Sequence, residues 1–126
     1  MESPKAPYIH PETEAVGLFT RTASIDPATL DQRLANRTVH VLDVRQPAEW
    51  RHGHIRSSQN VPLMQLKSRL ATLRRDTPII TVCASGHRSN AAARILQRAG
   101  FQVENLKGGM HAWTKAGFPV DKPQRR

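Results

Sequence analysis

The sequence predicts an α/β fold in which a small parallel sheet is flanked by helices on both faces. Two observations support this prediction. Runs rich in β-branched residues alternate along the chain with segments of helical periodicity, and the clearest runs, 39–44 and 78–83, are apolar almost throughout. Such continuous apolar strands are typical of parallel sheets that are buried on both faces.

The chain of 126 residues is long enough for one domain. Prolines are frequent near both ends, and apolar periodicity is weak there. We therefore expect a mobile N-terminal arm at 1–16, a single folded domain at 17–118 and a frayed C-terminal tail at 119–126.

The first half of the chain begins with a predicted helix. Asp26 is a favourable N-cap, and Pro27 suits the first helical position. Leu30 and Leu34 lie one helical turn apart and share a face, so we expect this helix to run to about residue 36. The next segments are a buried strand, a short helix and a strand end or turn, at 39–44, 46–53 and 61–63.

The second half continues the alternation. Leucines 63, 66, 70 and 73 recur at spacings of 3, 4 and 3, which predicts an amphipathic helix. The later segments are a buried strand, a helix that Gly100 ends, a third strand and a last helix that Gly108 opens, at 78–83, 89–99, 101–106 and 108–116.

The charge balance favours anionic partners. Lys and Arg number 19 against 10 Asp and Glu, which gives a formal net charge of +9. Such a surface can attract nucleic acid or small anions. Aromatic residues make up only 5% of the chain and no Lys/Arg run reaches five, so nucleic acid is not the partner we favour.

The compartment is expected to be the cytoplasm. The start of the chain has no apolar segment of a secretory signal, and no run approaches the roughly 18 apolar residues of a membrane span. Cys83 is the only cysteine, which excludes an intramolecular disulfide and a cysteine-rich zinc site. We therefore expect no membrane partner and a reducing environment.

The segment that follows the second clear strand carries the candidate chemistry. Cys83 ends that strand, at the sheet edge where ligands bind in such folds. Backbone N–H groups of a strand–loop–helix turn, together with the helix N-terminus, form a nest for an anion, and Gly86 permits the positive φ that a nest needs. We expect a nucleophilic Cys83 thiolate, stabilised there without a dedicated base. The expected substrate-binding residues are Ala84, Ser85, Gly86, His87, Arg88 and Ser89.

The competing interpretation is that Cys83 is a small buried hydrophobe, as free cysteines often are. The residues after Cys83 are mostly polar, flexible or charged, which is a poor setting for inert packing. We therefore favour the reactive thiol.

Five motifs in order resemble those of the rhodanese family of single-domain sulfurtransferases. They are Leu42-Asp43-Val44-Arg45, Glu49-x3-Gly53-His54-Ile55, Asn60-Val61-Pro62, Cys83-x4-Arg88-Ser89 and Gly108-Gly109-x3-Trp113. The resemblance covers about residues 20–118 and implies the family's α/β fold. It departs at Ser57-Ser58, where the family usually has Gly-Ala.

The resemblance implies transfer of sulfane sulfur by double displacement, with no metal or organic cofactor. The Cys83 thiolate would take sulfur from a small anionic donor such as thiosulfate, and would pass it from a persulfide to cyanide or a thiol. An alternative is a persulfide-carrier or redox-sensing module that acts on a protein partner. Phosphatases and arsenate reductases of the same fold have five residues between Cys and Arg, and this chain has four, so we rank them lower.

Three polar residues near the predicted site are expected to be structural: Asp43, Arg45 and Glu49. We expect an ion pair such as Arg45 with Glu49 to fix a loop. His52 and His54 flank Gly53 without a third ligand nearby, so a metal site is not favoured. His87 is expected at the surface. Trp50 and Trp113 are expected to be core or packing residues, and Met64 and Met110 are expected to fill the core.

Overall fold

The computed structural model describes residues 22–122, and the predicted N-terminal arm lies outside them. They form a five-stranded sheet in the order β1-β5-β4-β2-β3, in which every strand pair is parallel. The strands are β1 (Ser24–Ile25), β2 (His40–Asp43), β3 (Gln59–Asn60), β4 (Ile79–Val82) and β5 (Val103–Leu106). The predicted α/β class with a small parallel sheet is confirmed.

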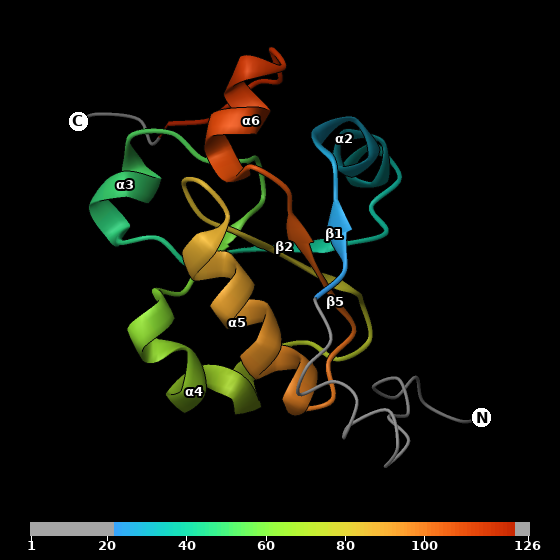
Figure 1. Cartoon of the computed structure of the whole chain (residues 1–126), viewed down its shortest axis with the longest axis vertical. Helices are drawn as coiled ribbons and strands as arrows, with labels where there is room; N and C mark the ends of the chain where they lie inside the picture. Colours follow the sequence, from blue (N-terminus) through green and yellow to red (C-terminus); the bar gives the residue numbers. More distant parts are fainter. Residues whose placement is uncertain (1–21, 123–126) are drawn as a thin grey trace.

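Helices cover both faces of this sheet (Figure 1). They are α2 (Pro27–Ala35), α3 (Pro47–Arg51), α4 (Leu66–Arg69), α5 (His87–Arg98) and α6 (Gly109–Lys115). One core cluster joins β2 and β4 to α4 and α5, through side chains such as Leu42, Leu66, Ile79 and Leu96. The other joins the sheet to α2 and α6, through Leu30, Ile80, Leu106 and Trp113. The continuous apolar strands of the sequence are thus explained by burial on both sides.

The ends of α2 and α5 are formed by the capping residues that the sequence predicts. Asp26 accepts a hydrogen bond from the Thr29 amide at 2.7 Å, and Pro27 occupies the first turn of α2. After α5, Gly100 adopts a φ of 93° and the Phe101 amide donates back to the Leu96 carbonyl. Phe101 therefore belongs to the end of α5, so β5 begins at Val103 and not at residue 101 as predicted.

The predicted continuous helix over the leucines at 63–73 is wrong. This segment consists of a 3-10 turn (Leu63–Gln65), the short α4 and a second 3-10 turn (Leu70–Thr72). Ser68 donates its hydroxyl to the Gln65 carbonyl and Thr72 donates to the Arg69 carbonyl. Both bonds reach three residues back and compete with the regular helical pattern, which breaks the segment.

Residues 119–121 are bonded to the domain. Trp113 donates its indole N–H to the Pro119 carbonyl at 2.8 Å. His54 and Asp121 form an isolated antiparallel bridge, and Val120 packs against the α2–α6 side of the core. The folded part therefore reaches at least Asp121, and the end of the predicted tail, 123–126, lies outside the described residues.

Within 22–122, the structure contains no helix that is both long and apolar enough to cross a membrane.

Helix α6 holds the loop that follows β4. The Met110 amide donates to the Cys83 carbonyl at 2.8 Å, and the His111 amide donates to the Ala84 carbonyl at 3.0 Å. Gly109 lies against this loop with a φ of 59°, and a Cβ atom there would overlap the same two carbonyl oxygens. The close approach of α6 to the loop therefore requires glycine at this position.

We predict that Gly109→Ala destabilises the protein by roughly 3 kcal/mol, because left-handed strain adds to a clash with rigid backbone. The measurement is the free energy of unfolding in urea. Gly117→Ala is the matched control: its φ is 87°, yet its Cβ would meet nothing within 4 Å. It should lose only about 1 kcal/mol. Equal losses in the two variants would contradict a tight contact between α6 and the loop.

Candidate active site

The loop between β4 and α5 surrounds the sulfur of Cys83 with hydrogen-bond donors. The Gly86 amide, the Ser89 amide and the Ser89 hydroxyl lie 3.1, 3.2 and 3.2 Å from Sγ. Gly86 has a φ of 108°, the left-handed conformation expected of it, and this turns its N–H toward the sulfur. Cys83 itself is only 1% exposed, so the sulfur lies at the base of the loop.

Two opposing effects set the ionisation of this thiol. Burial raises the pKa of Cys83, whereas the hydrogen bonds from Ser89 and from the Gly86 and Ser85 amides lower it. The donors prevail, and the pKa of the thiol lies below its ordinary value. The arrangement thus stabilises a thiolate, the reactive form of cysteine, without a neighbouring base.

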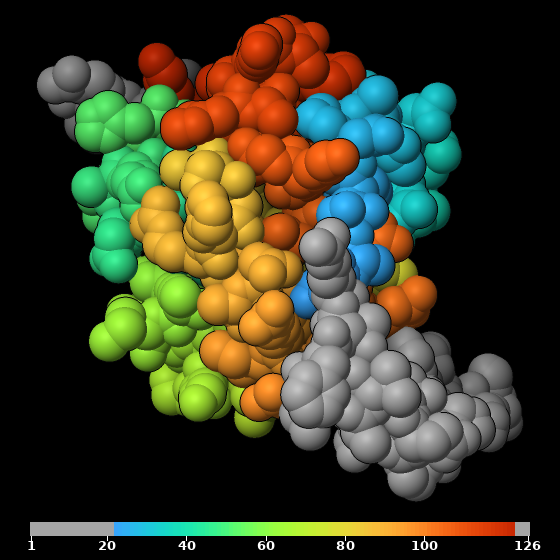
Figure 2. Space-filling model, viewed as in Figure 1, coloured from blue at the N-terminus to red at the C-terminus, as the bar shows by residue number. Residues whose placement is uncertain are grey.

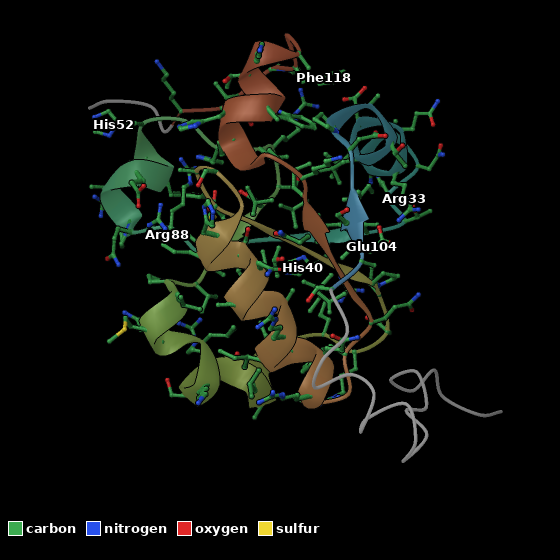
Figure 3. All side chains as sticks on the ribbon, in the orientation of Figure 1. Arg33, His40, His52, Arg88, Glu104 and Phe118 are labelled. Atoms are coloured by element: carbon green, nitrogen blue, oxygen red, sulfur yellow. The ribbon has the colours of Figure 1, made fainter. Side chains whose placement is uncertain are left out.

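Arg88 lies beside the loop and is paired with Glu49. Its two terminal nitrogens donate to the two carboxylate oxygens at 2.8 and 2.9 Å. Figure 3 shows Arg88 at the start of α5, on the side that faces α3. The hydrogen bonds from Arg88 lower the pKa of Glu49 to about 2, against the opposing effect of burial, so the pair stays charged at neutral pH. The guanidinium charge next to the loop is therefore matched by a carboxylate.

The expected ion pair between Arg45 and Glu49 is wrong, because each residue has another partner. Arg45 bonds Asp43 through Nε and Nη2, at 2.8 to 3.1 Å, and both side chains are buried. Arg45 also donates to the Gly53 carbonyl at 2.8 Å, and so ties the end of β2 to the turn after α3. Asp43 lies closer to Arg45 than Glu49 does, because Asp43 and Arg45 are two positions apart and project from the same side of the extended chain. The acid that pairs with Arg45 is therefore Asp43, and not Glu49.

The remaining loop residues lie nearer the surface than Cys83 does. Ser85 and His87 are exposed, with the Ser85 hydroxyl 3.0 Å from His87 Nδ1, and Ala84 is half-buried. Figure 2 shows the start of α5, in yellow, packed between α3 in green and α6 in red. The structure thus places all of the predicted substrate-binding positions in one segment that follows β4 at the carboxyl end of the sheet, with Ser89 buried beside Cys83.

Other predicted residues lie away from the thiol. His54 is buried, bonds the Trp50 carbonyl at 2.8 Å and stacks on the Trp50 ring at 3.7 Å, whereas His52 is exposed. The described part of the chain holds no group of three His, Cys, Asp or Glu placed to bind a metal. Trp113 and Met110 are buried as expected, but Met64 is 89% exposed, so its assignment to the core is wrong. Leu63 and Leu66 pack on the core, and Met64 projects from the other side of this turn.

Two residues that hold the loop were not predicted in that role. Gly109 allows α6 to reach the carbonyls of Cys83 and Ala84. Asn105, on β5, donates its side-chain amide to the Gly86 carbonyl at 3.2 Å. The available signal was an amide side chain near the end of the predicted strand 101–106, since a buried polar group needs a partner.

Comparison with known proteins places this site in a family. A family model described as "Rhodanese-like domain" matches residues 26–116. A protein named sulfurtransferase from Allochromatium vinosum is 35% identical over 102 residues, which are 79% of this chain and 95% of that protein. The crystal structure of a rhodanese-related protein from Thermoplasma volcanium superposes with a TM-score of 0.75 at 35% identity, and covers 79% of this chain and 97% of that one.

The length of the match differs among relatives. The Bacillus subtilis protein YqhL is 40% identical over 82 residues, which are 64% of this chain but only 65% of that protein. The similarity therefore applies to the domain, and not to the whole of every relative.

We predict that Ser89→Ala raises the pKa of Cys83, because one of the donors to Sγ is lost while the side-chain volume is kept. Below the thiol pKa, alkylation by iodoacetamide should slow roughly two- to tenfold, the scale of one hydrogen bond. Rates measured across pH give the midpoint for each variant. Wild-type protein should titrate below the ordinary thiol value of about 8.5.

The control is Ser85→Ala, since the Ser85 hydroxyl bonds His87 and its backbone amide is kept. Its alkylation profile should match wild type. A wild-type midpoint at or above the ordinary thiol value would contradict a nest that holds an anion.

Proposed function

Because the chain belongs to the rhodanese-like family, we propose that it is a sulfurtransferase that moves sulfane sulfur through a persulfide on Cys83. The observation that carries the proposal is the sulfur of Cys83, which is buried at the sheet edge and approached by three donors. A thiolate so held is ready to attack sulfur, and the loop has the four residues between Cys83 and Arg88 that suit a single sulfur atom in this family.

The first half-reaction loads sulfur onto the protein. The Cys83 thiolate attacks the outer sulfur of a donor such as thiosulfate and forms a new S–S bond. The bond from that sulfur to the sulfonate group breaks, and sulfite leaves with the electron pair. Cys83 then carries a persulfide whose terminal sulfur is negative, so charge is conserved.

The second half-reaction unloads the sulfur. A nucleophilic acceptor, cyanide or a thiolate, attacks the terminal sulfur, and the S–S bond to Cys83 breaks. The product is thiocyanate or an acceptor persulfide, and the Cys83 thiolate is regenerated. No electrons are gained or lost overall, so no cofactor is required. Two such steps with a covalent intermediate predict ping-pong kinetics.

The loop residues have distinct roles in this scheme. Negative charge passes between Cys83 and the transferred sulfur, and the Gly86 and Ser89 donors stabilise it in a water-poor site. Arg88 stands at the mouth, where a donor anion enters. Its pairing with Glu49 weakens the attraction that a free guanidinium would exert on the donor anion. The mechanism also needs a free thiol, for which we propose a reducing compartment, the cytoplasm.

The central experiment is intact mass after incubation with thiosulfate. We predict that the wild-type protein gains the mass of one sulfur atom, and that cyanide removes it with release of thiocyanate. Cys83→Ser should gain nothing and should lose turnover, because a serine hydroxyl is not ionised at neutral pH. Its far-UV circular dichroism should match wild type. Sulfur transfer by the serine variant at a comparable rate would overturn the proposal.

The acceptor decides whether this activity is small-molecule turnover or relay to a protein. A steady-state thiosulfate–cyanide assay measures the first. Transfer of labelled sulfur from the loaded protein to proteins of a lysate measures the second. Faster discharge by a protein than by cyanide at equal concentration would favour the relay.

We predict that Glu49→Gln lowers the KM for thiosulfate by roughly two- to fivefold, the range of an exposed ion pair, because it frees the Arg88 guanidinium for the donor anion. Arg88→Ala should raise the KM, since an unpaired Glu49 carboxylate would then repel the donor. Steady-state kinetics measures both.

The matched control is Asp76→Asn, which frees Arg74 from a similar pair elsewhere on the surface and changes the net charge equally. Its KM should stay at the wild-type value. An unchanged KM in Glu49→Gln would mean that Arg88 does not meet the donor.

A further inference from the structure

A buried pair of polar side chains connects the sheet to the Cys83 loop. Asn105 on β5 and Thr81 on β4 are cross-strand register partners, and they are 8% and 0% exposed. Thr81 donates its hydroxyl to Asn105 Oδ1 at 3.2 Å, and Asn105 Nδ2 donates to the Gly86 carbonyl at 3.2 Å. A continuous path of hydrogen bonds therefore runs from the centre of the sheet to the loop.

This path fixes the orientation of the Asn105 amide. The Gly86 carbonyl can only accept, so the NH2 group must face it. The Thr81 hydroxyl then meets the amide oxygen and donates to it, and it also lies 3.4 Å from the Glu104 carbonyl. A flipped amide would set its oxygen against the Gly86 carbonyl and lose that bond, and the Thr81 hydroxyl could then donate only to the more distant Glu104 carbonyl.

The anchored residue is the one whose amide points at the sulfur. Gly86 has φ 108° and ψ −10°, and its N–H lies 3.1 Å from Cys83 Sγ. A glycine can rotate its flanking peptide groups at little steric cost, and such a rotation would turn an N–H away from the sulfur. Two bonds oppose this at its carbonyl, one from Asn105 and one from the Asn90 amide at 3.1 Å. Only the first ties the loop to the sheet, since Asn90 belongs to α5.

We propose that Asn105, oriented by Thr81, is a positioning residue that keeps the Gly86 N–H directed at the Cys83 sulfur. Neither side chain bonds the sulfur, so both act through Gly86. The consequence for turnover rests on the proposed sulfur transfer. The consequence for the thiol does not, because it is measured with no sulfur donor present.

The test is Asn105→Leu, which nearly preserves volume and removes both side-chain bonds. At a pH below the thiol pKa, alkylation of Cys83 by iodoacetamide should slow roughly three- to tenfold, as expected for one misdirected donor, while the limiting rate at high pH is kept. In the sulfurtransferase assay kcat should fall, with little change in the KM for thiosulfate, since Asn105 does not touch the donor.

A second variant tests the path through Thr81. Thr81→Val keeps the shape of the side chain and removes the hydroxyl, and it should shift the alkylation profile in the same direction by a smaller amount. In the Asn105→Leu background it should cause no further shift, because Thr81 acts only through Asn105. Additive shifts would overturn the assignment of a single path. If Asn105→Leu does not fold, Thr81→Val carries the test alone.

Asn60→Leu is the control for loss of a buried asparagine. Asn60 also donates its amide to strand-end carbonyls, those of Asp43 and Arg45, at 3.0 and 2.9 Å, but does not bond the Cys83 loop. It should lower stability and leave the Cys83 alkylation profile unchanged. A wild-type profile in a folded Asn105→Leu or Thr81→Val protein overturns the proposal. A shifted profile without sulfur transfer in the wild-type protein would leave it standing and refute the proposed function.

Discussion

Burial of the Cys83 sulfur imposes the constraint on which the rest of the site depends. A thiolate removed from water is unfavourable unless directed donors replace the solvent, and the structure supplies them from Gly86 and Ser89. Donors within a loop are useful only if the loop keeps its shape. Three different elements enforce that shape: β4 precedes the cysteine, α5 begins within the loop, and α6 binds the carbonyls of Cys83 and Ala84.

Two ion pairs lie around the site, and the position of the outer pair depends on the inner one. The buried pair of Asp43 and Arg45 fixes the exit of β2 and, through the Gly53 carbonyl, the turn after α3. This places α3, whose Glu49 carboxylate accepts from the Gln46 amide at 2.9 Å and from Arg88. The two ion pairs therefore have different roles. The inner one shapes the backbone, and the outer one balances the guanidinium charge beside the Cys83 loop.

The sequence was most informative where burial leaves a regular pattern. Continuous apolar runs predicted β2 and β4, and the polar residues after Cys83 predicted the loop with a positive φ at Gly86. It was least informative where an element is too short or a partner is distant. Strand β1 has only two residues and no apolar run, so no strand was predicted before the helix that Asp26 caps.

Ion-pair partners were harder to predict than elements. Spacing along the chain suggested Glu49 for Arg45, but Glu49 pairs with Arg88, which lies 39 positions away in the sequence. The same holds for Asn105 and Gly86, which are 19 positions apart. Sequence patterns report local geometry and burial, whereas these contacts arise from the parallel strand order.

The hydrogen bonds from α6 to the loop also have a consequence for folding during synthesis. The amides that bind the loop carbonyls belong to Met110 and His111, which follow the cysteine late in the chain. Within residues 22–122, β1 is the first strand to leave the ribosome, and the one strand that it pairs with there is β5. A growing chain therefore cannot complete the sheet, or form the hydrogen bonds between α6 and the loop, until residues beyond 111 have emerged. The donors that surround the Cys83 sulfur are therefore held in place by a part of the chain that is synthesised after the cysteine itself.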